Sequence, residues 1–399
     1  MVHTRGPGAL TPGTPGSGRV PEDDRMPLED LVTGHGTAEA AVDNDIPERV
    51  RRTLEDYLHE RLRQCGELDP AVAGAAGELT DFVLRGGKRI RPTFAWWGWR
   101  AAGGPAFGPR AGTMLRAASS LELIQAGALV HDDLIDDSAT RRGSPTVHVR
   151  FAESHREHGY RGSAENFGLA AAVLLGDLAL TWADDMLHSA GLPRVALERA
   201  LEPWRAMRTE VLAGQYLDML GQARADESPE AALRIDELKS ASYTVERPLQ
   251  FGAEIAGADR TTLEVLRRFG ADIGVAFQLR DDLLGLFGDP AVTGKPAGDD
   301  LREGKRTVLM AEGVLRARQQ REESTLRLFE SSLGDAELTD ERVRLVREGL
   351  ERLGAVRAVE ERIDTLSRSA LSTLHTSELP EPAVRGLERL AVSVTDREA

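Results

Sequence analysis

Residues 110–137 read RAGTMLRAASSLELIQAGALVHDDLIDD, an apolar stretch rich in Ala and Leu that ends in four aspartates. Ala and Leu favour helices, so we predict one long helix with Asp132, Asp133, Asp136 and Asp137 at its C-terminal end. Because consecutive helical residues are about 100° apart, Asp132 and Asp136 lie one turn apart on one face. A helix C-terminus already carries partial negative charge, so this first acidic motif needs a cation. Carboxylate oxygens suit Mg²⁺ or Ca²⁺.

A second acidic motif, FQLRDDLLG at residues 277–285, also ends an apolar helical pattern. Asp281 and Asp282 are followed by two apolar residues, as is the first aspartate pair. A single motif of this kind can be merely a solvated helix end. Two copies favour a different interpretation, in which the two helix ends face each other across a helical bundle and bind metal.

The remaining sequence predicts an all-α fold. Aromatic residues make up only 5% of the chain, and Ala, Leu, Arg and Glu dominate. Residues 1–44, rich in Gly and Pro, are predicted to be a disordered tail, and residues 45–399 to form one folded domain. The segment FGDPAVTGKPAGDDLREG at 287–304 interrupts the helical pattern, and loops of this length are often functional.

The overall charge and composition exclude several classes of protein. A net charge of −15 argues against general nucleic-acid binding, which depends on neutralising phosphates with Lys and Arg. No apolar run reaches the ~18 residues of a candidate membrane span, and no signal peptide is apparent at the start. Cys65 is the one cysteine, so no internal disulfide can form, which fits a cytoplasmic location.

Basic residues cluster as strongly as the acids do. Residues 86–92 read GGKRIRP, and Pro92 is suited to the first turn of a helix. A phosphate at that helix N-terminus would be favoured both by the cations and by the helix dipole. Further basic residues are Arg141, Arg142, Lys239, Lys295 and Lys305. Metal-binding acids together with these cations indicate a pyrophosphate that is held by bridging Mg²⁺.

The segments GGKRIRP, HDDLIDDSATRRG and GVAFQLRDDLLGLFGDPAVTGKPAGDDLREGKRT together resemble the trans-isoprenyl diphosphate synthases, the polyprenyl synthetase family. The resemblance covers residues 45–399 and is greatest to geranylgeranyl diphosphate synthases of actinobacterial type. It implies a single catalytic domain of antiparallel helices around a deep central cavity. It also implies a homodimer.

The resemblance assigns roles to individual residues. Asp132, Asp136 and Asp281 match metal ligands, and Asp133 and Asp282 complete the predicted catalytic acids; three Mg²⁺ ions are expected. Lys88, Arg91 and Arg142 match residues that hold isopentenyl diphosphate, and Gln125 stands where many relatives have His. Arg141, Lys239 and Lys295 match residues that bind the allylic diphosphate. The predicted substrate-binding set also includes Arg89, Gln278 and Lys305.

The second motif departs from the usual pattern, because Gly285 replaces its last aspartate. One potential ligand is therefore missing. Asp289 or Asp299 could compensate through a water molecule.

The activity implied is Mg²⁺-dependent, head-to-tail transfer of a prenyl group. Isopentenyl diphosphate would condense with dimethylallyl, geranyl or farnesyl diphosphate, and pyrophosphate would be released. Gly127 and Ala128 precede Asp132 by about one turn, where an aromatic residue would block the cavity. Their small size predicts a C20 product, geranylgeranyl diphosphate, or a longer chain.

Other functions stay open on the sequence. A class I terpene cyclase shares the helical fold and acidic motif, but does not need two diphosphate sites. A regulatory subunit of a heteromeric prenyl synthase usually lacks the aspartate motifs. His131-Asp132 also suggests an HD-type phosphohydrolase, although the nearby His148, His155 and His158 are expected in a polar loop.

Overall fold

The computed structural model describes residues 42–288 and 297–396, and the all-α prediction is confirmed for them. The elements in chain order are η1 (Val42–Asn44), α1 (Ile46–Leu68), α2 (Pro70–Leu84), α3 (Ile90–Ala101), α4 (Pro109–Ile135), β1 (Thr140–Arg141), β2 (Ser144–Pro145), α5 (Val147–Glu157), α6 (Ala164–His188), α7 (Arg194–Arg224), α8 (Pro229–Asp236), η2 (Glu237–Glu246), α9 (Arg247–Ala256), α10 (Arg260–Phe287), α12 (Asp299–Arg302), α13 (Val308–Gln319), α14 (Glu323–Ser332), α15 (Asp340–Leu353), α16 (Ala355–His375) and α17 (Glu381–Thr395). In the described ranges the only strands are β1 and β2, a two-residue antiparallel hairpin directly after α4.

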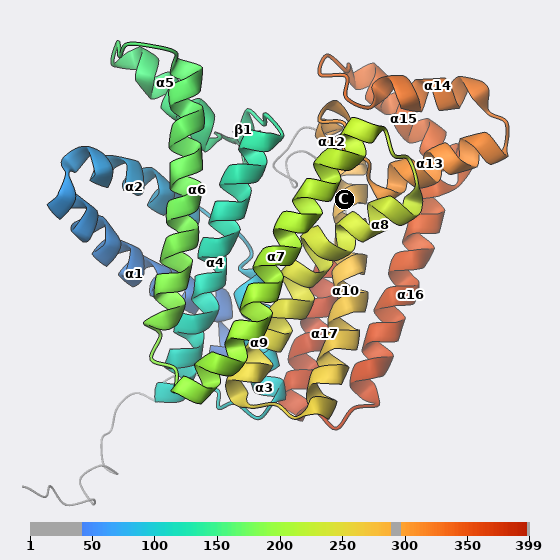
Figure 1. The fold of residues 1–399 in the computed structure, drawn as a ribbon. Helices are drawn as coiled ribbons and strands as arrows, with labels where there is room; N and C mark the ends of the chain where they lie inside the picture. The colour runs from blue at the N-terminus through green and yellow to red at the C-terminus, as the bar shows by residue number, and fades with distance from the viewer. Residues whose placement is uncertain (1–41, 289–296, 397–399) are drawn as a thin grey trace, which may run out of the picture. The chain divides into compact units, whose positions relative to one another are not determined.

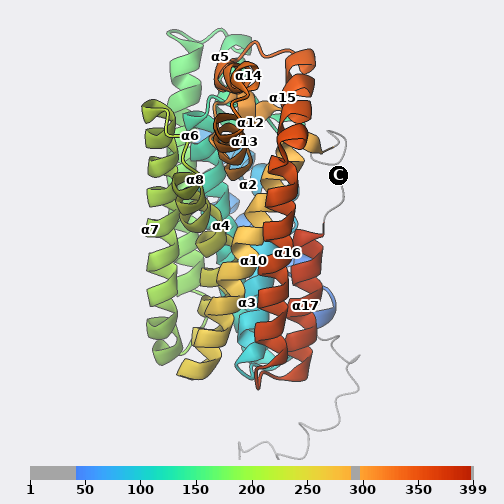
Figure 2. The same cartoon turned by 90° about the vertical axis from the view of Figure 1, so that its right-hand side faces the viewer.

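The long helices run alternately up and down in Figures 1 and 2. Helix α4 packs against α6, and α10 packs against α16 and η2. Helices α4 and α10 both end near the top of Figure 1, so the antiparallel arrangement brings both acidic motifs to one end of the bundle. Helices α4 and α10, which begin 151 residues apart in the sequence (260 − 109), thereby end close together without any sheet to align them.

Local sequence signals define the helix that carries the second motif. The Asp259 side chain accepts a hydrogen bond from the Thr262 amide at 2.7 Å and so caps the start of α10, an interaction that typically stabilises a helix by about 1 kcal/mol. After the second motif, the Thr307 side chain caps α13. These caps fix where the helices on either side of the 288–305 segment begin.

Close helix contacts depend on glycines at two interfaces. A Cβ atom at Gly252 of α9 would lie 1.7 Å from the Ala95 carbonyl oxygen of α3. One at Gly214 of α7 would lie 2.6 Å from the Lys239 backbone nitrogen of η2. Since no side chain fits in such gaps, these glycines let the backbones pack directly, and the second one sets the position of η2.

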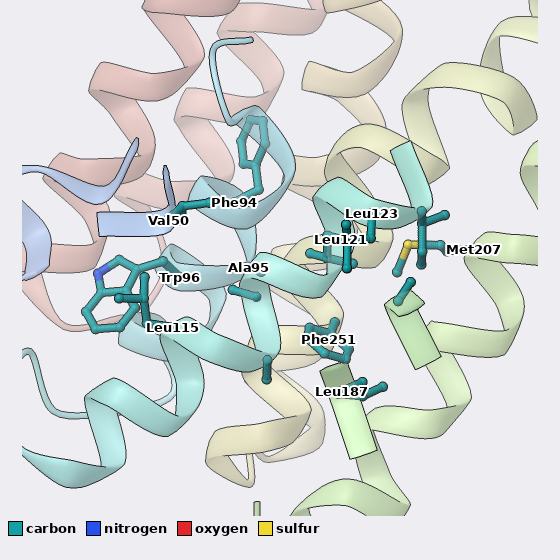
Figure 3. Packing of buried hydrophobic residues seen from close by; sticks show 14 of the residues in the cluster. Val50, Phe94, Ala95, Trp96, Leu115, Leu121, Leu123, Leu187, Met207 and Phe251 are labelled. Carbon is teal, nitrogen blue, oxygen red and sulfur yellow. The ribbon is translucent and has the colours of Figure 1, made fainter. Parts of the chain in front are cut away.

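The buried apolar side chains form two clusters. The larger one joins α1, α3, α4, α6, α7 and α9 and is built around Phe94, Trp96, Leu121 and Phe251, which Figure 3 shows interleaved. The smaller one joins α10 to α13–α16 around Phe329. Leu279 and Leu283 of α10 belong to this second cluster, so the helix turn that carries Asp281 and Asp282 is anchored by its apolar neighbours.

Some sequence expectations need correction at the edges of the domain. Residues 42–44 were predicted to belong to the tail, but they form a 3-10 turn in which Val42 is buried and Asp43 accepts a 2.7 Å hydrogen bond from the Trp96 ring nitrogen. Residues 1–41, the rest of the predicted tail, lie outside the described residues.

Helix α5 corrects one sequence prediction, and helix α6 has an unusually apolar composition. His148 and His155 lie on helix α5 rather than in a polar loop. Helix α6 has a mean hydropathy of 1.4 over an 18-residue window and, among the described helices, it alone is long and apolar enough to cross a membrane. Its contact with α4 buries part of this apolar surface, and 39% of the window is buried.

Candidate functional site

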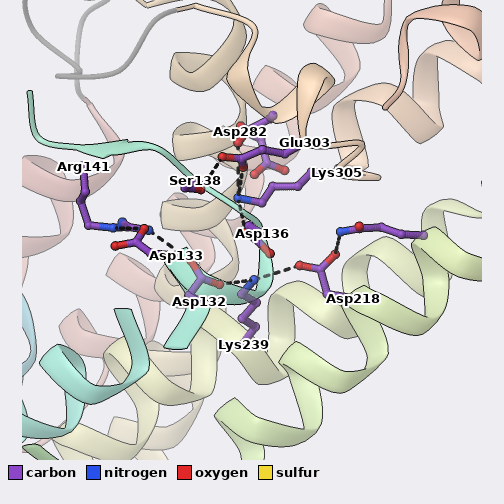
Figure 4. Close-up of polar contacts among 12 residues, drawn as sticks. Asp132, Asp133, Asp136, Ser138, Arg141, Asp218, Lys239, Asp282, Glu303 and Lys305 are labelled. Carbon is purple, nitrogen blue, oxygen red and sulfur yellow. Dashed lines mark hydrogen bonds and ion pairs between the residues drawn. The ribbon is translucent and has the colours of Figure 1, made fainter. Parts of the chain in front are cut away.

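Five elements supply the polar cluster at the upper end of the bundle: the end of α4, helix α7, helix η2, the end of α10 and residues 298–305 (Figure 4). Helix η2 is a π-helix, a rare form that is often found at functional sites. It carries Lys239 between α7 and the end of α4.

Asp132, at the start of the first motif, lies between two cations. Its Oδ1 is 3.1 Å from Lys239 Nζ, and its Oδ2 accepts a 3.3 Å hydrogen bond from Arg141. Arg141 also donates to Asp133 Oδ1 at 2.6 Å. Burial by itself would raise the pKa of Asp132, but Lys239, Lys305 and Arg141 outweigh it and lower the pKa. Asp132 is therefore ionised at neutral pH.

Asp136 lies one turn later and meets a different cation. Its Oδ2 is 3.1 Å from Lys305 Nζ, which is also 2.6 Å from Glu303 Oε2. Ser138 donates to the other Glu303 oxygen at 2.8 Å. Burial and the neighbouring Asp132 raise the pKa of Asp136 despite Lys305. These contacts tie the loop after the first motif to the segment that follows the second motif.

Helix α7 contributes residues that sequence reasoning missed. Asp218 Oδ2 is 2.9 Å from Lys239 Nζ, so Lys239 is shared between Asp132 and Asp218. One turn earlier, both amide atoms of Gln215 are buried and find no partner within the described ranges. Gln215 and Asp218 lie about one helical turn apart, and this spacing in the sequence could have indicated that both belong to the site. Their position opposite Lys239, however, depends on the packing of η2 on α7.

The two aspartates of the second motif differ in their burial. Asp282 is 5% exposed, and its Oδ1 accepts a 2.7 Å hydrogen bond from the Gln278 side chain. Its Oδ2 is buried and has no hydrogen-bond partner among residues 42–288 and 297–396. Burial and the neighbouring carboxyl of Asp236 raise the pKa of Asp282 well above its ordinary value. Asp281, before it, is exposed.

The acidic side chains of this cluster offer carboxylate oxygens, the type of donor that a hard divalent cation prefers. Carboxylates from α4 and α10 gather at one end of the bundle, and Asp282 has an oxygen without a partner in the described part of the chain. In the described ranges, no three His, Cys, Asp or Glu side chains are close enough to hold a metal ion. Lys239, Lys305 and Arg141 instead lie among the carboxylates and balance them. The assignment of Asp132, Asp136 and Asp281 as metal ligands stays a prediction.

The GGKRIRP segment divides into residues that face different ways. Lys88 is exposed. Arg91 donates to the Thr244 hydroxyl at 2.7 Å, and its guanidinium lies 4.3 Å from the centre of the Tyr243 ring. The Arg91 Nε atom is buried without a partner in the described chain. Part of the Arg91 guanidinium is thus oriented by the protein while another donor stays available.

Arg89 corrects the sequence prediction, because it does not face the same way as its neighbours. Its backbone is left-handed, with φ of 50°, and its side chain is 6% exposed. The guanidinium donates to Glu122 at 2.6 Å and to the Val83 carbonyl at 2.7 Å. A substrate-binding role is inconsistent with a guanidinium already committed to a buried ion pair.

Arg142 and Gln125 lie near this basic segment. Arg142 is left-handed in the hairpin between β1 and β2, and its guanidinium would lie 3.3 Å from a Cβ atom at Gly87. Burial and the neighbouring Arg141 lower the pKa of Arg142. The side-chain oxygen of Gln125 on α4 is buried without a partner among the described residues. Lys295, predicted to bind the allylic substrate, lies outside the described residues.

Gly127 also needs correction, because it faces helix α6. A Cβ atom there would lie 2.9 Å from both the Gly176 carbonyl oxygen and Leu180 Cγ. Ala128, the next residue, is partly exposed instead of packed. The two residues therefore point in different directions, and a larger side chain at Gly127 would meet α6.

His131 packs against the same helix. Its Nε2 is 3.3 Å from the Val173 carbonyl oxygen, and it fills the space that a side chain at Gly176 would take. The His131 ring therefore fills the contact between α4 and α6.

Comparisons with known proteins agree on one family. The polyprenyl synthetase family model matches residues 76–346. A crystal structure of a geranylgeranyl pyrophosphate synthase from Corynebacterium glutamicum, complexed with isoprenyl diphosphate and magnesium, is 44% identical with a TM-score of 0.85, and the alignment covers 88% of this chain and 99% of that one.

Two curated relatives have related names. A short chain isoprenyl diphosphate synthase from Methanothermobacter thermautotrophicus is 29% identical over 81% of this chain and 90% of its own length. A geranylgeranyl diphosphate synthase from Mycobacterium tuberculosis is 30% identical over 68% of this chain and 73% of its own length.

Proposed function

Because this chain belongs to the polyprenyl synthetase family, we propose that it joins isopentenyl diphosphate head-to-tail to an allylic diphosphate and releases pyrophosphate. The proposed product is geranylgeranyl diphosphate. The observation that carries the proposal is that Lys239 and Lys305 pair with Asp132 and Asp136 of the first motif, and that Lys305 lines one pocket together with Asp282 of the second motif. Such a mixture of acids and bases suits metal-bound diphosphate.

The acids would hold magnesium, with Asp132, Asp136 and Asp281 as ligands and Asp133 and Asp282 beside them. Three ions per site belong to the proposal. When bound, magnesium would neutralise charge on the departing diphosphate. The crystal structure of the Corynebacterium relative in complex with magnesium supports this choice of metal.

The bases would hold the two substrates. Lys88, Arg91 and Arg142, with the Gln125 amide, would bind isopentenyl diphosphate, and the unpartnered Arg91 Nε offers it a donor. Lys239, Lys305, Arg141 and Lys295 would bind the allylic diphosphate, and Gln278 would orient Asp282, to which it already donates.

In the proposed reaction, the bond between C1 and oxygen of the allylic substrate breaks, and its electron pair leaves with pyrophosphate. The double bond of isopentenyl diphosphate supplies the electrons of the new carbon–carbon bond. A proton is then lost from C2 of the isopentenyl unit to the released pyrophosphate. Lys239 and Lys305 would stabilise the leaving group, because both stay protonated. Burial lowers their pKa values, but the surrounding carboxylates raise them more. These carboxylates include Asp132, Asp136, Asp218 and Asp300. The protein then contributes positioning and charge stabilisation.

Chain length would be set by Ala128, in a cavity between the helices. Gly127 has no part in this proposed control of chain length, because it packs on α6. A small residue at 128 leaves room for a C20 product.

We also propose that the enzyme is a homodimer in the cytoplasm. Helices α6 and α7 expose large apolar side chains, among them Leu174 at 69%, Leu212 at 63% and Tyr216 at 61%. Contiguous apolar patches usually mark protein interfaces. Cys65 is a free thiol, which fits a reducing compartment.

The test is to incubate the purified protein and Mg²⁺ with labelled isopentenyl diphosphate and each allylic primer in turn. A labelled C20 diphosphate is expected. Longer products would indicate a long-chain synthase, and a hydrocarbon made from the allylic substrate alone would indicate a terpene cyclase. No product without a second polypeptide would indicate a regulatory subunit and would overturn the proposal.

A further inference from the structure

Gly285 marks the position where the second motif lacks an aspartate. It follows Asp281 by four residues on α10, so the two share one face of the helix, one turn apart. A carboxylate at 285 would therefore lie beside that of Asp281.

The space beside Gly285 is taken by another carboxylate. A Cβ atom on Gly285 would lie 2.4 Å from Asp300 Oδ2, so Asp300 places its oxygen where a side chain at 285 would begin. The backbone holds this arrangement, because the Gly298 amide donates to the Gly285 carbonyl oxygen at 3.1 Å and the Lys305 amide donates to the Asp300 carbonyl oxygen at 2.8 Å. Asp300 thus approaches α10 from a different part of the chain.

A second observation indicates that this position serves a ligand. Asp282, Gly285, Asp300 and Lys305 line one small pocket. Asp282 is 5% exposed, and its Oδ2 lacks a hydrogen-bond partner in the described ranges. A buried carboxylate oxygen without a partner is costly, and a cation between Asp282 and Asp300 would offset that cost.

We propose that Asp300 supplies, through space, the carboxylate that Gly285 lacks, and so takes part in binding the divalent cation at the second motif. This inference rests on the proposed function, because it concerns the metal of the same site. Gly285 is then an adaptation that makes room for Asp300.

The earlier candidates for this role fit less well. Asp299, directly before Asp300, pairs with Arg302 at 3.2 Å. Asp289 lies outside the described residues. Asp299 is therefore a matched control, with the same chemistry one residue away.

The experiment measures Mg²⁺ binding to the full chain by calorimetry in the presence of inorganic pyrophosphate, without turnover. Asp300→Asn is expected to weaken Mg²⁺ binding by about tenfold or more, and Asp299→Asn by less than about twofold. Gly285→Asp alone should also weaken binding, because two carboxylates then compete for one space. The double variant Gly285→Asp/Asp300→Asn should recover affinity to within about threefold of the parent.

Two results would overturn the inference: Asp300→Asn binding Mg²⁺ as tightly as the parent, or a double variant no better than Asp300→Asn alone. If Asp300→Asn does not fold, Gly285→Ala is the second variant. It displaces only the end of a flexible side chain, so unchanged Mg²⁺ affinity there would also refute the idea. If only this inference is wrong, the parent protein still forms product. If the proposed function is wrong, the parent protein forms no product.

Discussion

Replacing Arg89 by methionine should damage stability, whereas replacing its neighbour Lys88 by methionine should damage substrate binding. Arg89 and Glu122 are 6% and 7% exposed and 2.6 Å apart. Removing one partner of a buried ion pair typically costs about 3–5 kcal/mol, because the other charge is left buried and unpaired. Methionine keeps the length of the side chain and removes the charge.

This cost can be converted to a melting temperature. With an unfolding entropy of about 2 cal/mol/K for each of roughly 350 ordered residues, 3–5 kcal/mol corresponds to a decrease of about 4–7 °C. Lys88 is exposed, so Lys88→Met should change stability by less than about 0.5 kcal/mol.

Two assays on both variants separate the roles: thermal unfolding followed by circular dichroism, and the KM for isopentenyl diphosphate. We expect a lower melting temperature for Arg89→Met and a higher KM for Lys88→Met. A double variant Arg89→Met/Glu122→Leu should be more stable than the sum of its single changes predicts. The reasoning fails if Arg89→Met melts like the parent while its KM for isopentenyl diphosphate rises.

Three further predictions concern the site and the assembly. Asp132→Ala should lower turnover of labelled isopentenyl diphosphate by orders of magnitude while the circular dichroism spectrum stays unchanged, and parental turnover would reject a metal role for this residue. Ala128→Phe should shorten the product seen by chromatography, and an unchanged product spectrum would remove that residue from the control of chain length. Gly127→Ala should instead chiefly lower the melting temperature, because overpacking against α6 reduces the free energy of unfolding by about 1–3 kcal/mol. Leu174→Glu should convert the dimer to a monomer in light scattering, since it puts a charge on the proposed apolar interface, and a persistent dimer would place the interface elsewhere.

The acidic motifs were predictable because their spacing and their position at helix ends follow from helix geometry alone. The direction of individual side chains was not. Lys88 and Arg89 are adjacent and chemically alike, and only the left-handed backbone at Arg89 turns it towards Glu122. Gly127 and Ala128 differ by about 100° around the helix, and which of them meets α6 depends on where that helix packs.

Partners from distant parts of the chain were the least predictable. Asp218 matters because packing brings it to Lys239, and Glu303 matters because packing brings it to Ser138; neither carries a motif of its own. The same holds for Asp300, whose carboxylate reaches Gly285 from outside α10.

The contrast between the two motifs indicates where a cation is needed most. The cations of the protein lower the pKa of Asp132 in spite of its burial, so Lys239, Lys305 and Arg141 balance this carboxylate of the first motif, whereas burial and Asp132 raise the pKa of Asp136 despite Lys305. Burial and Asp236 raise the pKa of Asp282 well above its ordinary value, so the second motif is not balanced in this way. A metal ion held by Asp282 would offset the burial of that carboxylate, whereas a metal ion held by Asp132 or Asp136 would compete with lysines that already lie 3.1 Å from them.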